Sequence, residues 1–163
     1  MDLHISATAT ASRLSGDKFA ASALEEGLVQ RTTILLGDDN SGVLDHVGKM
    51  LEKEKSYQVV AAISDGRVVV REYLRLRPDI IILDISFGEL SGIDIAHELR
   101  DSGCRAKIVF LTVHEDSDYV NASMGAGGSA YVVKSRLSQD LLSAIKAVLS
   151  NKIFVSPNLL YDG

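Results

Sequence analysis

The chain has 163 residues, of which 46% are hydrophobic and 24% charged, and this composition is typical of one globular domain with short extensions. The net charge of -5 speaks against nucleic-acid binding by this chain itself, because contacts to phosphates need a basic patch. A lone cysteine, Cys104, cannot form an internal disulfide, and the sequence shows neither a signal-peptide pattern nor an apolar run of bilayer length. We therefore expect a cytoplasmic protein without membrane contact.

Residues 1–30 are rich in Ala, Ser and Thr without a sustained hydrophobic period, and we interpret them as an extension, partly disordered or helical near residues 20–30. From Arg31 onward, short runs rich in Ile and Val alternate with helical segments, which is typical of βαβ units. We predict strands at 32–37, 57–63, 79–84, 106–112 and 129–133 and helices at 41–54, 66–77, 91–101, 116–125 and 138–150. This alternation over residues 31–152 predicts an α/β, flavodoxin-like, doubly wound sheet of five parallel strands in the order 2-1-3-4-5, with five helices.

Local signals support these boundaries. Ser91 and Ser138 are predicted N-caps of the third and fifth helices, and Pro78 favours an extended residue before it. The glycines of residues 125–128 precede a strand and not a helix, so we expect a tight turn there and not a phosphate-binding loop.

Polar side chains stand where the apolar strands end. Asp38 and Asp39 close the run ILLGDD, Asp84 closes IIILD, Thr112 closes IVFLT and Lys134 closes AYVVK. Because the C-termini of parallel strands converge on one edge of the sheet, these groups should meet in one crevice. Crowded carboxylates need a cation among them, and Mg²⁺ prefers oxygen ligands. A lysine and a hydroxyl beside a metal-bound aspartate suit the stabilisation of a phosphoryl group on that aspartate.

The motifs LLGDDN, IIILDIS, IVFLTVHED and GAGGSAYVVKS, in this order, resemble the receiver domain of bacterial two-component response regulators. The resemblance implies a protein that accepts a phosphoryl group from a histidine kinase or histidine phosphotransfer protein. It also implies that phosphorylation switches the surface of the last two strands and the last helix to control an output such as transcription. The resemblance further implies that a second copy of the domain binds on phosphorylation and forms a homodimer.

The segment NKIFVSPNLL resembles the connection between receiver and helix-turn-helix in NarL/LuxR-type regulators. We therefore interpret residues 153–163 as a C-terminal tail or the start of a linker to an absent output domain, and both alternatives stay open.

Individual roles follow from the same resemblance. Asp84 matches the phosphoacceptor, and Asp38, Asp39, Asp84 and the backbone carbonyl of Ser86 match the ligands of Mg²⁺. Lys134 matches the lysine that pairs with the phosphoryl oxygens.

Four residues match positions that respond to the phosphoryl group. Thr112 matches the hydroxyl that moves to bond it, and Tyr131 matches the aromatic switch that then turns inward. Ser86 and His114 match the two positions that border the path of the hydrolytic water, so they are implied to tune dephosphorylation. Tyr131 as a packed strand residue and His114 as a solvated loop residue are the alternatives.

The chain departs from the family pattern at two places. Phe87 and Gly88 stand where many receivers have Met-Pro, which changes the loop that pairs with the kinase. Ser135 stands where many receivers have proline, which leaves the geometry of the Lys134–Ser135 bond open.

Three other function classes fit the sequence less well. A Mg²⁺-dependent aspartyl-phosphate phosphatase on this fold typically has a second acid two residues after the nucleophile, where this chain has Ser86. A flavin or nucleotide binder would need a phosphate cradle after the first strand, and a degenerate receiver would not need the intact acidic and basic residues. We therefore expect a phosphoacceptor with self-catalysed phosphotransfer and dephosphorylation, and no enzyme in the usual sense.

Overall fold

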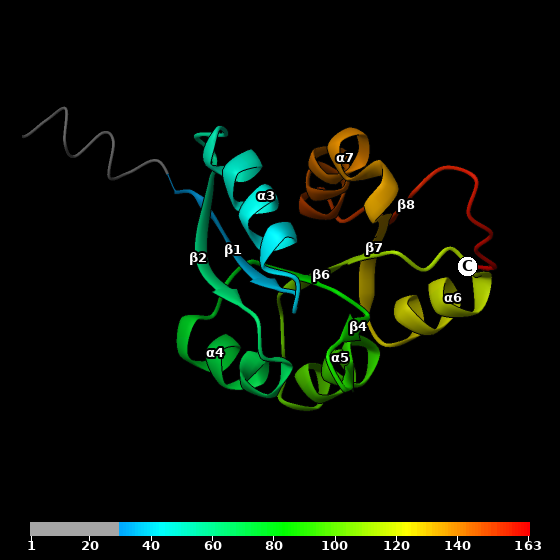
Figure 1. The fold of residues 1–163 in the computed structure, drawn as a ribbon, viewed down its shortest axis with the longest axis horizontal. Coiled ribbons are helices and arrows are strands. Elements are labelled where there is room, and N and C mark those ends of the chain that lie inside the picture. The colour runs from blue at the N-terminus through cyan, green and yellow to red at the C-terminus, as the bar shows by residue number, and fades with distance from the viewer. Residues whose placement is uncertain (1–29) are drawn as a thin grey trace, which may run out of the picture. The chain divides into compact units, whose positions relative to one another are not determined.

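The computed structural model describes residues 30–163, so the predicted N-terminal extension, apart from residue 30, lies outside the described residues. Strands and helices alternate along the described chain (Figure 1). The main sheet consists of β1 (Thr32–Gly37), β2 (Tyr57–Ile63), β3 (Ile80–Leu83), β6 (Lys107–Thr112), β7 (Gly128–Val133) and β8 (Phe154–Val155). The α-helices are α3 (Ser41–Glu52), α4 (Val69–Leu76), α5 (Gly92–Asp101), α6 (Ser117–Gly125) and α7 (Leu137–Leu149).

The strands pair in the order β2-β1-β3-β6-β7-β8, and every pair is parallel. The predicted α/β fold and the order of its five strands are confirmed. β3 lies in the middle of the sheet, and Ile80, Ile81, Ile82 and Leu83 are all buried, as expected for a strand covered on both faces.

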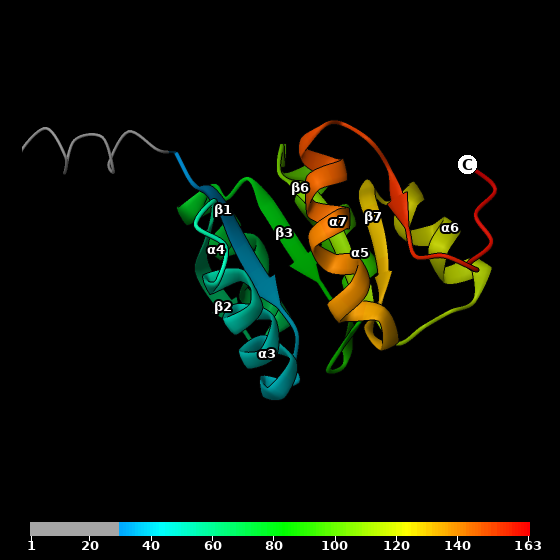
Figure 2. The ribbon, with the colours of Figure 1, turned by 90° about the horizontal axis from the view of Figure 1, so that it is seen from above.

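Helices cover both faces of the sheet (Figures 1 and 2). α3 and α7 pack on one face against a core that includes Leu36, Ile82 and Val132. α4, α5 and α6 pack on the other face, where the core includes Leu35 and Tyr131. Within residues 30–163, no helix combines the length and the apolar character needed to cross a membrane.

Short elements complete the fold and refine the predicted boundaries. The second predicted helix divides into a 3-10 turn, η1 (Gly66–Val68), and α4, and another 3-10 turn, η2 (Lys134–Arg136), joins β7 to α7. A two-stranded hairpin of β4 (Ser86–Phe87) and β5 (Leu90–Ser91) follows β3.

One strand and one helix cap differ from the prediction. β8 lies in the segment predicted as a tail or linker, and it adds a sixth strand to the described sheet. Ser91 is confirmed as the N-cap of α5, because its Oγ accepts from the N–H of Ile93 at 3.2 Å. Ser138 is not an N-cap, because η2 continues directly into α7 at Leu137 and places Ser138 inside the helix.

Backbone conformation also differs from the prediction at one connection. Arg77, before Pro78, is left-handed with φ of 46° and not extended. It closes α4 by donating to the carbonyl of Tyr73 at 2.7 Å, and its guanidinium lies 5.3 Å from the centre of the Tyr73 ring. The predicted tight turn before β7 is confirmed by Gly127, whose φ is 104°. No peptide bond in the described part of the chain is cis.

Candidate functional site

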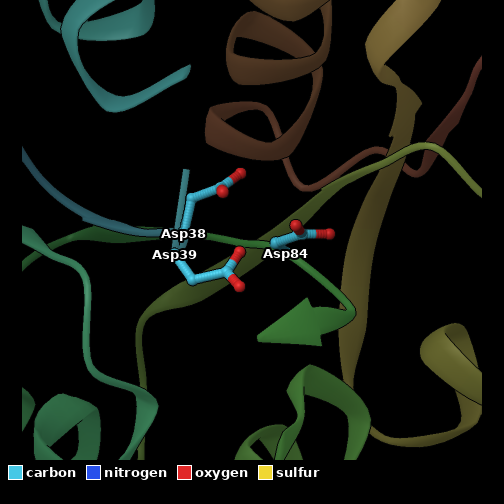
Figure 3. Close-up of side chains that lie close together, drawn as sticks. All are labelled: Asp38, Asp39 and Asp84. Carbon is cyan, nitrogen blue, oxygen red and sulfur yellow. The ribbon is translucent and has the colours of Figure 1, made fainter. Parts of the chain in front are cut away.

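Three aspartates converge at the C-terminal edge of the sheet (Figure 3). Asp38 and Asp39 follow β1, and Asp84 follows the neighbouring strand β3. Gly37 and Leu83 are paired in register, so the residues after them leave the sheet side by side. Asp38 and Asp84 are buried, at 4% exposure each, and Asp39 is exposed. One oxygen from each of the three carboxylates lies within 4.8 Å of the other two.

The N-terminus of α5 packs directly on the backbone of Asp84. Gly92 donates its N–H to the carbonyl of Ile85 at 2.6 Å, and a Cβ at Gly92 would overlap the carbonyl oxygen of Asp84. Glycine is therefore the residue that allows this approach. On the other side, the N–H of Asp84 donates to the carbonyl of Gly37 at 2.9 Å, so the aspartate is fixed by backbone contacts on both sides.

Lys134 supplies the positive charge of the site from the end of β7. Its Nζ donates to Asp84 Oδ2 at 2.8 Å and forms an ion pair of the same length with Asp38 Oδ2. Burial alone would lower the pKa of Lys134, but its bonds to the two carboxylates outweigh burial and raise the pKa. Burial raises the pKa of Asp38, and the contacts with Lys134 and the N–H of Asn40 only partly oppose this rise.

The acidic cluster fits a hard divalent cation. Of its three carboxylates, only Asp38 and Asp84 contact the ammonium of Lys134, so the cluster carries an excess of negative charge. Asp38 Oδ2 is buried and, apart from the ion pair, accepts no hydrogen bond. A buried carboxylate oxygen without a hydrogen bond, beside two further carboxylates, is the donor set that Mg²⁺ prefers.

Thr112 and Tyr131 both contact the backbone of His114. Thr112 lies at the end of β6, is fully buried, and accepts from the N–H of His114 at 3.4 Å. Tyr131 is already fully buried in this structure, whereas the resemblance implies an inward turn only after phosphorylation, and its hydroxyl donates to the carbonyl of His114 at 2.8 Å. Burial raises the pKa of the Tyr131 phenol, so this hydroxyl keeps its proton and acts as a donor.

The His114 side chain joins two loops of the site. Its Nε2 lies 2.7 Å from the Oγ of Ser86, whose N–H donates to Asp84 Oδ1 at 3.3 Å. The imidazole stacks on Tyr119 of α6 with the ring centres 4.0 Å apart and an interplanar angle of 18°. The sequence placed Ser86 and His114 beside the same water path but predicted neither their contact nor the stacking on Tyr119, because no spacing signal connects residues on different segments.

The Phe87-Gly88 departure places another backbone donor at the site. The N–H of Gly88, in the β4–β5 hairpin, donates to Asp39 Oδ2 at 3.0 Å. The structure thus places seven of the eight residues that the sequence predicted for the site at one edge of the sheet or on the segments beside it, and the eighth, Tyr131, lies within β7 and reaches the loop after β6 with its hydroxyl. The eight residues are Asp38, Asp39, Asp84, Ser86, Thr112, His114, Tyr131 and Lys134.

Comparison with known proteins decides the family. Residues 34–146 match the sequence model of the response regulator receiver domain. The chain belongs to this family. The receiver domain is the part of a two-component response regulator that serves phosphoacceptor signalling, and the family is not one of conventional enzymes.

Named relatives agree with this assignment. The transcriptional regulatory protein DesR of Bacillus subtilis is 31% identical over 130 residues, which are 80% of this chain and 64% of DesR. The nitrate/nitrite response regulator protein NarP of Escherichia coli is 34% identical over 122 residues, 74% of this chain and 57% of NarP. The chain thus spans less than two thirds of the length of these relatives.

A solved structure supports the fold of this receiver domain. A two-component response regulator of the LuxR family from Aurantimonas sp. SI85-9A1 superposes with a TM-score of 0.75 at 30% identity. The superposition covers 79% of this chain and 92% of that chain.

Proposed function

We propose that this receiver domain accepts a phosphoryl group on Asp84 from a phosphohistidine of a histidine kinase or phosphotransfer protein. One observation carries the proposal: the buried carboxylate of Asp84 has two further carboxylates within 4.8 Å and the ammonium of Lys134 at 2.8 Å. An oxygen of Asp84 attacks the phosphorus, the P–N bond breaks, and its electron pair stays on the donor imidazole. The product is an acyl phosphate on Asp84.

Charge neutralisation and alignment are what this transfer needs from the protein. Asp38, Asp39, Asp84 and the backbone carbonyl of Ser86 would hold Mg²⁺, which supplies positive charge to the phosphoryl oxygens. Lys134 already bridges Asp38 and Asp84, so its ammonium needs only to change partners to reach an oxygen of the new group. The backbone contacts on both sides of Asp84 keep its carboxylate in place for the attack.

The phosphoryl group on Asp84 would also attract the hydroxyl of Thr112. Its hydroxyl accepts a bond from the N–H of His114, and we propose that it moves to donate to a phosphoryl oxygen. Tyr131 holds the carbonyl of the same residue, so a change at Thr112 alters the loop to which Tyr131 is bound. The surface of β6, β7 and α7 is therefore the proposed output surface.

Ser86 and His114 are proposed to set the lifetime of the acyl phosphate. Their side chains bond each other at 2.7 Å, and Ser86 also contacts Asp84 through its backbone. This contact would restrict the approach of water to the phosphorus more than either side chain could alone.

The proposed output rests on the relatives. Several carry names of transcriptional regulators, and this chain matches part of their length. We propose that the receiver controls transcription, with a second receiver as its partner after phosphorylation. DNA contact by residues 30–163 themselves is not expected, because the whole chain carries a net charge of -5.

Intact mass after incubation with acetyl phosphate and Mg²⁺ tests the proposed acceptor. We expect one added phosphoryl group on the wild-type chain and none on Asp84→Asn or in the presence of EDTA. Asp45→Asn, which changes an exposed aspartate of α3, is the matched control and should label normally. Labelling of the Asp84→Asn variant would refute the assignment.

A further inference from the structure

The C-terminal segment, residues 152–163, docks on the receiver and does not extend away from it (Figure 2). Phe154 and Val155 form β8 and pair with Ala130 and Tyr131 at the outer edge of β7. Further along, the backbone and side chain of Asp162 bond the side chain of Asn121 on α6 at 3.2 and 3.5 Å. We call residues 152–163 the strap, because they run from the end of α7 along the outer edge of β7 to α6.

Apolar contacts accompany these bonds. Val155, Leu159 and Tyr161 of the strap pack against the core cluster that contains Tyr131. The strap therefore lies on the strand that carries the proposed aromatic switch, and it covers an edge that would otherwise present unpaired backbone groups.

Ser156 is the buried anchor of the strap. It is 1% exposed, and its N–H donates to the carbonyl of Tyr131 at 2.9 Å. Its Oγ accepts from the N–H of Val133 at 3.1 Å and donates to Asp140 Oδ2 at 2.8 Å. One serine thus bonds the last part of β7 and helix α7 together.

Asp140 connects this anchor to η2. The carboxylate of Asp140 is 4% exposed and accepts from Nε and Nη2 of Arg136 at 2.8 and 3.1 Å. The bonds from Arg136 and Ser156 hold the pKa of Asp140 below its ordinary value although burial opposes them. The carboxylate is therefore ionised, and its two oxygens depend on Arg136 and Ser156 for their hydrogen bonds.

Arg136 belongs to the same 3-10 turn as Lys134. A contiguous path therefore runs from Asp84 through Lys134 and the turn to Arg136, then through Asp140 to Ser156. Each of its non-covalent steps is a charged hydrogen bond of 2.8 Å. Such bonds are strong and depend on geometry.

We propose that occupancy of the Asp84 site releases the strap through this path, an inference that rests on the proposed function. The docked strap fits the arrangement in which Lys134 bridges Asp38 and Asp84. When Lys134 turns to a phosphoryl oxygen, η2 moves with it and displaces Arg136 from the buried carboxylate. Asp140 then bonds Ser156 less well, and the strap detaches from β7. The strap is thus an output element of the receiver.

Hydrogen exchange of the strap, measured by mass spectrometry with and without beryllium fluoride and Mg²⁺, tests the proposal. Beryllium fluoride mimics the phosphoryl group, and a bound ¹⁹F signal reports its binding independently. We expect exchange of the strap amides to accelerate roughly 5-fold or more, the lower end of ordinary coupling between sites. A bound ¹⁹F signal without faster exchange overturns the strap inference alone. No bound ¹⁹F signal overturns the proposed function, and the strap inference with it.

The thermodynamic linkage between ligand binding and docking of the strap supplies a second test. If binding releases the strap, a variant with a weakened strap must bind beryllium fluoride more tightly, by at most the factor by which binding weakens the docking of the strap. Ser156→Ala removes the anchor hydroxyl and should show both faster strap exchange without ligand and tighter binding. Ser138→Ala, an exposed serine of α7, is the matched control and should change neither. If Ser156→Ala does not fold, Arg136→Lys keeps the charge but loses the bidentate contact and should act in the same direction. Unchanged affinity in a folded variant with faster strap exchange overturns the coupling.

Discussion

Removing the charge of Lys134 should destabilise the domain far more than removing an equivalent charge at the surface. In Lys134→Met, the carboxylates of Asp38 and Asp84 lose the ammonium that now lies 2.8 Å from each. Asp38 and Asp84 are each 4% exposed, so water replaces the lost partner only in part. Breaking a buried ion pair from one side costs about 3–5 kcal/mol. The Lys134 side chain keeps 17% exposure and Asp38 can take up a proton, so we expect a loss of about 3 kcal/mol, the lower end of that range.

Urea unfolding at pH 7 without divalent cations measures this loss. The matched control is Lys49→Met, which removes an ion pair with Asp45 that is nearly as short, at 2.9 Å, but whose lysine side chain is 71% exposed. Solvent screening makes such surface pairs weak, so the control should unfold nearly as the wild type does. Equal losses in the two variants would refute the argument that burial makes the Lys134 contacts strong.

The urea unfolding of Lys134→Met should also depend on pH and on Mg²⁺. Burial raises the pKa of Asp38 in the folded protein above its ordinary value of 3.8. The stability that this shift contributes is therefore fully present below pH 3.8 and is lost as the pH rises through the raised pKa. Without Lys134, which lowers the pKa of Asp38, that pKa should rise further. The stability of Lys134→Met should therefore fall more steeply above about pH 4 than that of the wild type. Added Mg²⁺ replaces the missing charge and should stabilise the variant more than the wild type.

Three further predictions concern the geometry around Asp84. Gly92→Ala places a Cβ onto the carbonyl of Asp84, so we expect slower phosphorylation by acetyl phosphate together with a lower unfolding midpoint. Tyr131→Phe loses the 2.8 Å bond to His114 and should cost about 1 kcal/mol in urea unfolding, with smaller beryllium-fluoride shifts in amides 115–150. Ser86→Ala and His114→Ala should each change the acyl phosphate lifetime, and the double variant should add little to either. Additive effects would show that their 2.7 Å contact is irrelevant to dephosphorylation.

The sheet and its polar edge could be predicted because both depend on short-range sequence patterns. Apolar runs alternate with helical segments, and the order of a doubly wound sheet then places strand ends on one edge. Asp84 and Lys134 are 50 residues apart in sequence, yet each is the first residue after a strand at the same edge of the sheet. Because β6 separates β3 from β7, the long side chain of Lys134 is also needed to bring its ammonium to 2.8 Å from Asp84. The proximity of Asp38, Asp39 and Asp84 follows from the same rule.

The remaining features depend on neighbours that no local pattern reveals. β8 has two residues, too few to show a period, and the bond of the adjacent Ser156 to Asp140 of the preceding helix has no signal in the sequence. Arg77 adopts a left-handed conformation against the preference of a residue before proline, because its backbone and guanidinium both bind Tyr73. The contact of Ser86 with His114 joins two loops, and the rotamer of Tyr131 depends on the carbonyl that accepts its hydroxyl.

β7 explains how one phosphoryl group could act on several parts of the surface. Lys134 follows its C-terminal end, Tyr131 lies within it facing the α6 side, and its outer edge carries the strap. Because the backbone of Tyr131 bonds Ser156 while its hydroxyl bonds His114, this residue touches both the strap and the loop after Thr112. A close-packed interior does not deform continuously, so a displacement at the end of β7 is expected to shift these contacts between discrete arrangements. The loop and the strap should therefore respond together to beryllium fluoride, and a variant that frees only one of them would separate the two outputs.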